Sequence, residues 1–323
     1  MRCILNSSID PFFNLAAEEF VLKNFTDDVF MLWRNDQSII IGKYQNTAAE
    51  INLDFVKERG IKVVRRQTGG GAVFHDLGNV NYTFIAPKDS GDFRTFSEPI
   101  LQVLNKLGVP AKFEGRNDLT IDGQKFSGNA QCIYQNRILH HGTLLFASEM
   151  DDLSAALKVN PLKFKDKAVK SVRKRVTNIS THLPHPMSVT EFIDTVMQYV
   201  STQVENAEFY TFTDDDLQKI NQLKKEKYDT WEWNYGASPK FDMGKQIRTQ
   251  GGNVEVTLAV EKGKISQFKI YGDFFFRKDL EDFERLFIGQ DYKEENLRQL
   301  LNSIQLDDYL CKVSAEEMME LLF

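Results

Sequence analysis

Short turns between neighbouring strands constrain the fold of this chain more than any other feature of its sequence. The stretch DLTIDGQKFSGNA, residues 118–130, contains an Asp-Gly pair at 122–123. Such a pair between strand-like runs is the strongest short-range signal for a hairpin. A second hairpin is predicted in GGNVEVTLAVEKGKISQFKIYGDFFF, residues 251–276, with EKGK as its turn. A doubly wound fold would need strict alternation of strands and helices, so this order of elements favours an α+β fold.

The length of the chain and a change of pattern near residue 251 predict two domains. A chain of 323 residues is long enough for about two. We expect a larger domain over residues 1–245 and a small strand-strand-helix-helix domain over 246–323. Within the larger domain, SIDPFFNLAAEEF predicts a helix capped by Asp10 with Pro11 in its first turn, and EINLDFVKERG predicts a helix ended by Gly60.

Charge and composition exclude several classes of function. The formal net charge of −6 disfavours nucleic acid as a partner. No run approaches the ~18 apolar residues of a membrane span, and the N-terminus lacks the pattern of a signal peptide. Three scattered cysteines, Cys3, Cys132 and Cys311, indicate a reducing compartment. We therefore expect a cytoplasmic protein with no nucleic-acid or membrane partner.

Three consecutive glycines, Gly69 to Gly71, follow the predicted strand IKVVRR. Glycines cost conformational entropy on folding, so the triplet indicates that something approaches the bare main chain closely. Successive N–H groups there could face a phosphate, and Arg65 and Arg66 just upstream would add positive charge. The spacing matches neither the P-loop nor the dinucleotide-binding fingerprint. A phosphate-binding loop and a simple turn or bulge both remain open.

The predicted Asp-Gly hairpin brings further polar residues together. Lys125 follows the turn, and its compact ammonium suits phosphoryl oxygens that gain charge during a reaction. Asn117 and Asp118 lie on the preceding strand, where a carboxylate near phosphates suits a water-rich Mg²⁺. The alternatives are a solvated lysine and an aspartate that caps a turn.

Adjacent histidines in LHHGTLLF, His140 and His141, should point to opposite faces of a strand. They cannot both bind one metal ion, and the few histidines show no zinc-site spacing. We expect one ring to face a site and the other to pack.

Two other stretches are less specific. The basic run over 158–175 predicts a solvated surface or a mobile loop that closes on an anionic intermediate, rather than a nucleic-acid patch. In WEWNY, a strand-like pattern would place Trp231, Trp233 and Tyr235 on one face, as core packing or an aromatic wall.

Taken together, the motifs resemble the lipoate–protein ligase A family. The matching stretches, in order along most of the first 245 residues, are DPFFNLAAEE, LWRN, RRQTGGGAVFHDLGN, GRNDL, KFSGNA, HHGTLLF, SVRKRVTNI and WEWNYG. The resemblance implies a mixed, largely antiparallel sheet flanked by helices, like that of biotin ligases and class II synthetases, and a small α/β C-terminal accessory domain. It also implies a reaction in which lipoate and ATP give lipoyl-AMP, whose acyl group passes to a lysine of a carrier domain.

The resemblance also implies roles for residues of this chain. Lys125 would be catalytic and would contact both ATP and lipoate, and Asp118 would help to hold Mg²⁺. Lys163 and Lys167 in the basic run would shield the adenylate from water. The other residues implied at the nucleotide are Arg66, which would hold phosphate, Gly70, Gly71, Ala72, Val73 and Phe74. The other residues implied at lipoate are Leu15, Trp33, His75 and His141, with Phe74 as a further candidate for the apolar slot.

Three alternatives are open at this point. An octanoyl or lipoyl amidotransferase of the same superfamily would use a cysteine thioester, and Cys132 lies seven residues after Lys125. A non-catalytic ligand-binding protein could share the fold, and a biotin ligase matches the motifs less well. For a ligase, the expected partners are lipoyl domains of 2-oxoacid dehydrogenase complexes or the H protein of glycine cleavage, with lipoate and ATP as small molecules.

Overall fold

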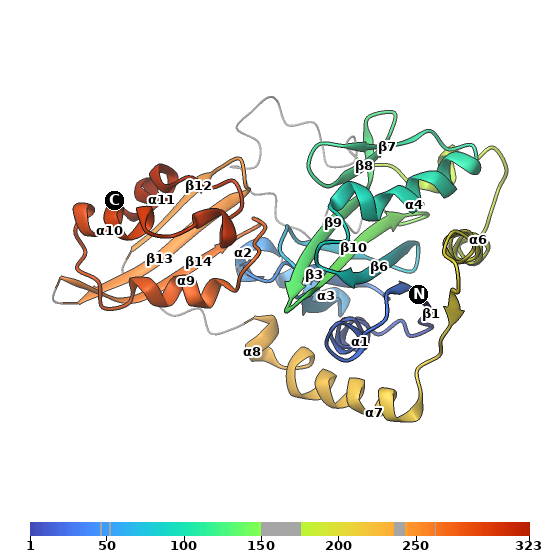
Figure 1. Ribbon diagram of the computed structural model, residues 1–323, viewed down its shortest axis with the longest axis horizontal. Helices are drawn as coiled ribbons and strands as arrows, with labels where there is room; N and C mark the ends of the chain where they lie inside the picture. Colours follow the sequence, from blue (N-terminus) through green and yellow to red (C-terminus); the bar gives the residue numbers. More distant parts are fainter. Residues whose placement is uncertain (46, 52, 150–175, 236–242, 262) are drawn as a thin grey trace.

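A computed structural model describes all residues of the chain except 46, 52, 150–175, 236–242 and 262. The described residues form a larger part around an eight-stranded sheet and a smaller C-terminal part beside it (Figure 1). No helix in these residues combines the length and the apolar character that crossing a bilayer requires.

The eight-stranded sheet is mixed and largely antiparallel, as predicted. In the described residues, β1 runs parallel to both of its neighbours, and all the other pairs are antiparallel. The strands in spatial order are β11 (Glu208–Phe209), β1 (Arg2–Leu5), β2 (Val29–Trp33), β6 (Asn79–Pro87), β10 (Arg137–Leu145), β9 (Gln124–Tyr134), β8 (Asp118–Ile121) and β7 (Ala111–Glu114).

A separate three-stranded sheet carries residues 67–72, the glycine segment, which contains the three consecutive glycines. β3 (Ser38–Ile41) lies between β4 (Lys62–Arg65), which is parallel to it, and β5 (Val73–His75), which is antiparallel. The chain between β4 and β5 contains the three glycines. The segment is therefore held at both ends by pairing to the same central strand.

Helices cover both faces of the large sheet, and strand alternation decides what each face presents. On β6, Val80, Tyr82 and Phe84 pack with α4 (Phe93–Lys106) and α6 (Val189–Thr202). On the opposite face, Ile85 packs with α1 (Pro11–Asn24) and α7 (Asp214–Leu223). The polar β6 residues Asn79, Asn81 and Thr83 alternate with the first set and are also buried. The helical segments are α1 (Pro11–Asn24), α2 (Thr47–Glu50), α3 (Leu53–Arg59), α4 (Phe93–Lys106), η3 (Ile179–His182), α6 (Val189–Thr202), α7 (Asp214–Leu223), η4 (Lys224–Tyr228) and α8 (Trp231–Asn234).

Local signals fixed several element ends as predicted. Asp10 caps α1 by accepting a hydrogen bond from the Phe12 N–H at 3.2 Å, and Pro11 is the first helical residue. Gly60 follows α3 with a φ of +62°. Asp122 and Gly123 have φ values of +50° and +73°, the left-handed pair that a tight two-residue hairpin needs.

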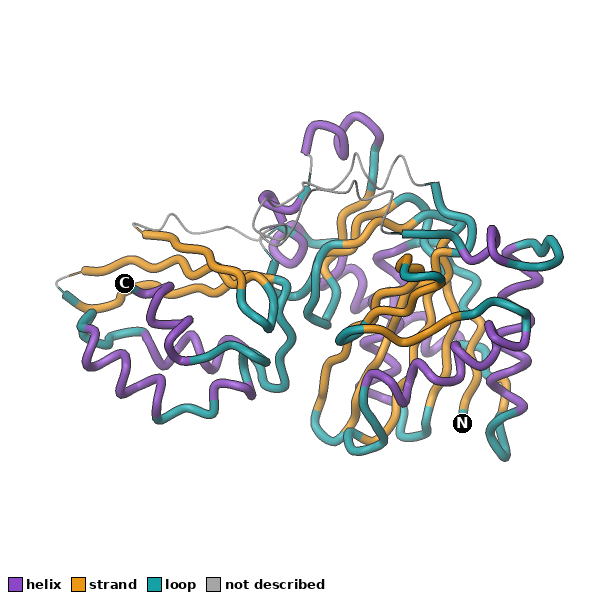
Figure 2. Tube along the Cα trace, turned by 90° about the horizontal axis from the view of Figure 1, so that it is seen from above, coloured by secondary structure: helices purple, strands orange, loops and turns teal. Residues whose placement is uncertain are grey.

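The C-terminal part packs helices on one face of a three-stranded antiparallel sheet (Figure 2). The predicted hairpin is β13 (Asn253–Glu261) with β14 (Lys264–Gly272), and β12 (Met243–Arg248) pairs with its first strand. The boundary at 245/246 stays a prediction. The helical segments are α9 (Leu280–Phe287), α10 (Glu294–Asn302), η5 (Leu306–Asp308) and α11 (Ala315–Leu322).

The prediction of a strand in the tryptophan-rich run was wrong. Trp231–Asn234 is the short helix α8, capped by the Thr230 hydroxyl, which accepts from the Trp233 N–H at 3.3 Å. Residues four apart share a helix face, so Trp231 stacks on Tyr235 with an interplanar angle of 13°. Trp233 instead contacts Lys227, whose Nζ lies 4.0 Å from its ring. A single alternating run of aromatics did not distinguish a strand from one helical turn.

Candidate active site

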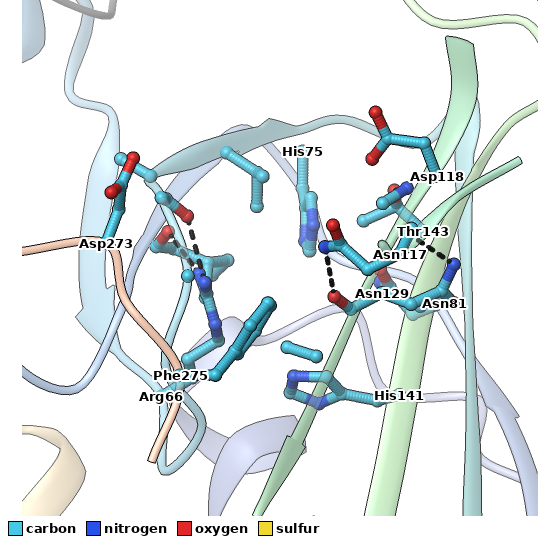
Figure 3. Close-up of a pocket in the computed structure, with 18 of the residues that line it drawn as sticks. Arg66, His75, Asn81, Asn117, Asp118, Asn129, His141, Thr143, Asp273 and Phe275 are labelled. Atoms are coloured by element: carbon cyan, nitrogen blue, oxygen red, sulfur yellow. Dashed lines mark hydrogen bonds between the residues drawn. The ribbon is translucent and has the colours of Figure 1, made fainter. Parts of the chain in front are cut away.

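A cavity of about 320 Å³ lies on the α1 side of the large sheet, next to the glycine segment. Figure 3 shows Asp273, Arg66 and Phe275 on one side of the cavity and Asp118, Thr143 and Asn81 on the other. The predicted site residues that line it are Leu15, Trp33, Arg66, Gly70, Gly71, Ala72, Val73, His75, Asp118, Lys125 and His141. The fold thus brings together almost all the positions that the motifs singled out.

Of the predicted residues that the structure describes, one does not line the cavity. The Phe74 side chain is buried in a separate hydrophobic cluster with Ile39 and Ile41, because β5 alternates between the two environments. Lys163 and Lys167 lie outside the residues that the structure describes.

The buried Arg66 side chain holds the main chain of the glycine segment by hydrogen bonds. Its Nη2 donates to the carbonyl oxygens of Gly69 and Gly71 at 2.6 and 2.9 Å, and its Nε donates to Thr68 Oγ1 at 2.9 Å. Burial lowers the pKa of Arg66 to about 10, so the guanidinium is charged at neutral pH. A fixed positive charge therefore lies directly against the main chain of this segment.

Arg65, the other arginine of the motif, serves a different segment. Its Nη1 donates to the carbonyl oxygens of Gly42, Lys43 and Gln45 at 2.9, 3.0 and 2.7 Å. Gly42 packs so closely on the glycine segment that a Cβ there would lie 1.9 Å from the Gly70 oxygen. Arg65 thus holds the turn against which the glycine segment rests.

Lys125 and Asp118 form an ion pair at the opposite wall. The Lys125 Nζ lies 2.7 Å from Asp118 Oδ1, and both side chains are partly exposed. A Cβ at Gly128 would lie 3.0 Å from the same Nζ, so the absence of a side chain there leaves room for the ammonium. The register shifts by one residue between Leu119 and Thr120 in this hairpin.

A buried network that the motifs did not predict joins α1 to the glycine segment. Glu18 Oε1 lies 3.0 Å from His141 Nδ1, and His141 Nε2 is hydrogen-bonded to Thr68 Oγ1 at 2.8 Å. The only sequence signal was a pair of adjacent glutamates inside an otherwise apolar stretch of the α1 helix. His141 faces this network, whereas the His140 ring packs on the Phe96 ring with 5.3 Å between their centroids. This confirms that the two histidine rings point to opposite faces.

The C-terminal part supplies one wall of the cavity through Asp273 and Phe275. The Arg116 guanidinium lies 4.1 Å from the centroid of the Phe275 ring. The Gly70 N–H points at the Phe274 carbonyl oxygen at 3.4 Å. Tyr44 of the larger part also contacts the start of α9, since its hydroxyl accepts from the Leu280 N–H at 2.9 Å. No local pattern in the sequence indicated these contacts, because they join segments more than 150 residues apart.

Cys132 lacks the features of a nucleophile. Its side chain is 6% exposed and packs in the hydrophobic cluster of α1 rather than in the cavity lining. Burial raises the pKa of its thiol to about 12, so almost none of it is thiolate at neutral pH.

Comparisons with known proteins match both parts of the chain. The family model described as the lipoyl protein ligase A/B catalytic domain matches residues 10–201, and that of the bacterial lipoate protein ligase C-terminus matches 238–322. The chain belongs to the lipoate–protein ligase family. It is therefore a ligase, and the resemblance inferred from the motifs is confirmed.

Relatives support the assignment along the whole chain. The lipoate–protein ligase LplJ of Bacillus subtilis is 43% identical over 332 residues, covering 100% of both chains. The crystal structure of P. falciparum LipL1 in complex with lipoate is 28% identical with a TM-score of 0.76, and the match covers 94% of this chain and 95% of that one. A lipoate–protein ligase A bound with ATP is 29% identical with a TM-score of 0.63, covering 73% of this chain and 98% of that one.

Proposed function

We propose that this chain is an ATP-dependent lipoate–protein ligase that first forms lipoyl-AMP and then transfers the lipoyl group to a lysine of a carrier domain. The observation that carries the proposal is the position of Lys125. Its ammonium lies at the wall of the cavity, with Arg66 and the glycine segment also in the lining. Relatives with bound lipoate and with bound ATP give the same two substrates.

The first half-reaction joins two anions, so it needs positive charge fixed in advance. The lipoate carboxylate attacks the α-phosphate of ATP, and pyrophosphate leaves. Arg66 supports the phosphates by its buried charge and by holding the glycine main chain, since most of its donors already face carbonyl oxygens. Lys125 exchanges Asp118 for the acyl and phosphate oxygens and stabilises their developing charge. Removal of a preorganised donor of this kind typically lowers the rate by ~10²–10³.

The residues near Lys125 fit a magnesium ion carried in by the nucleotide. Mg²⁺ is commonly held by one or two carboxylates together with phosphate oxygens and water. Within the described residues, no three His, Cys, Asp or Glu side chains cluster as a protein-only metal site. Asp118 would supply the carboxylate, and the ion would neutralise charge on the phosphate oxygens.

The lipoyl chain would lie along the apolar part of the cavity, between Leu15 and Trp33, with His75 and His141 beside it. Burial contributes roughly 0.8 kcal/mol per methylene, so the chain binds well with few polar contacts. The main chain of residues 70–74 would follow the nucleotide. The shielding of the adenylate by Lys163 and Lys167 rests on the sequence motif alone.

The second half-reaction requires a protein that presents a lysine amine. One relative is an archaeal bipartite lipoate protein ligase that was studied with its E2 lipoyl domain. The matched chain of that structure is 33% identical to this chain, with a TM-score of 0.65. We propose lipoyl domains of 2-oxoacid dehydrogenases and the glycine cleavage H protein as partners. Three unpaired cysteine thiols support a cytoplasmic setting.

A pyrophosphate-exchange assay tests the adenylation step. With lipoate, ATP and labelled pyrophosphate, we expect lipoate-dependent exchange of label into ATP. Lys125→Ala should lower that exchange at least about a hundredfold while the protein stays folded. Lys112→Ala is the matched control, because Lys112 is exposed on β7, two strands away from the β9 strand of Lys125, and does not line the cavity.

The same assay separates the alternatives. Absent exchange, together with transfer from an acyl-carrier donor that Cys132→Ser abolishes, would establish the amidotransferase. Full activity of Lys125→Ala would refute the catalytic role of this lysine. Lipoate binding with neither exchange nor transfer would identify a non-catalytic binding protein.

A further inference from the structure

Two buried hydrogen-bond donors line the cavity without a partner in the described residues. His75 is 3% exposed and Asn81 is 2% exposed, and both belong to the cavity lining. The His75 Nε2 and the Asn81 Nδ2 make no hydrogen bond within the described part of the chain. An unpaired buried donor costs free energy, so each such group needs an explanation.

A chain of amides fixes the proton on His75. The Asn14 Nδ2 donates to the carbonyl oxygens of Ser8 and Arg34 at 2.9 and 2.8 Å, and it also lies 2.8 Å from Asn35 Oδ1. Asn35 therefore turns its Nδ2 to His75 Nδ1, at 3.0 Å. His75 Nδ1 must accept, so Nε2 keeps its hydrogen. Burial lowers the pKa of His75 to about 3, which keeps this neutral tautomer at physiological pH.

Asn81 presents its donor beside the same part of the cavity. Its Oδ1 accepts from Asn79 Nδ2 at 3.0 Å, which leaves its own Nδ2 unpaired within the described chain. Asn81 is the register partner of Trp33 on the adjacent strand, and the Trp33 ring lies 6.4 Å from the ring of His75. Both donors therefore lie next to Trp33.

Asn81 lies two strands away from the position over which the Lys125 ammonium sits. The Lys125 Nζ sits over Gly128, whose N–H donates to Thr143 Oγ1 at 3.2 Å on the next strand. Thr143 is in turn the register partner of Asn81. Adjacent strands are ~4.8 Å apart, so two steps separate Gly128 from Asn81 by roughly 10 Å. An acyl chain with its carboxylate at Lys125 would bring its other end to Asn81 and His75.

We infer that His75 and Asn81 select acyl acids whose far end carries hydrogen-bond acceptors, such as the dithiolane sulfurs of lipoate, over acids that end in plain alkyl groups. The inference rests on the proposed function, because it takes the carboxylate to lie at Lys125. Disulfide sulfurs are weak acceptors, but they pair with donors that a methyl group would leave unsatisfied. A site built for hydrogen bonds rejects an analogue that lacks them.

Binding of lipoate and octanoate, which share one carbon chain, tests the inference by calorimetry. Wild-type protein should bind lipoate more tightly, and Asn81→Asp and Asn81→Leu should each lower the ratio of the two affinities about tenfold. Asn81→Asp keeps an acceptor for Asn79 and replaces the amide donor by a second carboxyl oxygen, whereas Asn81→Leu removes the donor without adding a charge. Leu15→Ala is the matched control: it removes apolar surface of the same slot, so it should weaken both acids and preserve their ratio. Thermal unfolding verifies that each variant is folded.

The outcomes separate this inference from the proposed function. An affinity ratio near one in the wild type, or an unchanged ratio in both folded Asn81 variants, overturns the selection. If the ratio falls as expected but no acid supports pyrophosphate exchange, the ligase reaction fails and the specificity of the cavity stands. If exchange occurs and the ratio does not respond to Asn81, the selection alone fails.

Discussion

Replacement of Thr68 by valine tests how the glycine segment is held. The hydroxyl of this fully buried residue meets two partners, Arg66 Nε at 2.9 Å and His141 Nε2 at 2.8 Å. Valine has nearly the same shape and removes both hydrogen bonds. Arg66 Nε keeps a longer bond to the Gly69 oxygen at 3.2 Å, so its loss is partial, about 1 kcal/mol. His141 Nε2 loses its partner at a cost of about 2 kcal/mol, which gives roughly 3 kcal/mol in total.

Urea unfolding and ATP-dependent kinetics measure the two consequences. Thr68→Val should lower the free energy of unfolding by about 3 kcal/mol and raise the KM for ATP, because Arg66 would hold the Gly69 and Gly71 carbonyls less firmly. Thr68→Ser retains the hydroxyl and serves as the control for the lost methyl group. Equal stability and equal KM for the valine and serine variants would refute the idea that this hydroxyl organises the segment.

Two further predictions concern acid stability and close packing. Burial alone would raise the pKa of Glu19, but Lys227, Lys23 and Tyr228 together lower it to about 2, below the ordinary value of 4.5. The depressed pKa of Glu19 contributes to the free energy of unfolding above pH 4.5, and this contribution is lost as the pH falls toward 2. In denaturation measured from pH 2 to 5, Glu19→Gln should therefore reduce the fall in the free energy of unfolding by roughly 3 kcal/mol. Gly42→Ala should lower the thermal midpoint severely, because its Cβ would lie 1.9 Å from the Gly70 oxygen. Gly115→Ala, with a φ of +63° and open space around it, should cost only about 1 kcal/mol, and similar midpoints for the two variants would contradict the packing argument.

The features that the sequence predicted well are local or periodic. The cap at Asp10, the turn at 122–123 and the opposed histidines depend only on residues a few positions apart. The gathering of the glycine segment and Lys125 in one cavity followed from a resemblance that covered many motifs. In the tryptophan-rich run, the alternating pattern was too short to specify a strand, and the Thr230 hydroxyl instead caps a short helix there.

The features that escaped prediction depend on partners distant in the chain. In the sequence, Glu18 is one of two adjacent acidic residues of a predicted helix. In the structure, its carboxylate contacts His141 and Thr83. From the sequence, Asn81 is one polar residue of an ordinary alternating strand, but in the structure every residue of that strand except Pro87 is buried. Arg66 was predicted to hold phosphate, and the sequence did not indicate that its Nη2 would donate to the Gly69 and Gly71 carbonyl oxygens. Which of these contacts forms is decided by tertiary packing, which no local pattern reports.

Phe275 of the C-terminal part lines the same cavity as the glycine segment of the larger part. A ligand that touches both Phe275 and the glycine segment binds only where the parts are together, so it stabilises their junction by the same free energy that the junction adds to its binding. Saturating ligand should therefore merge the melting of the two parts into a single cooperative event.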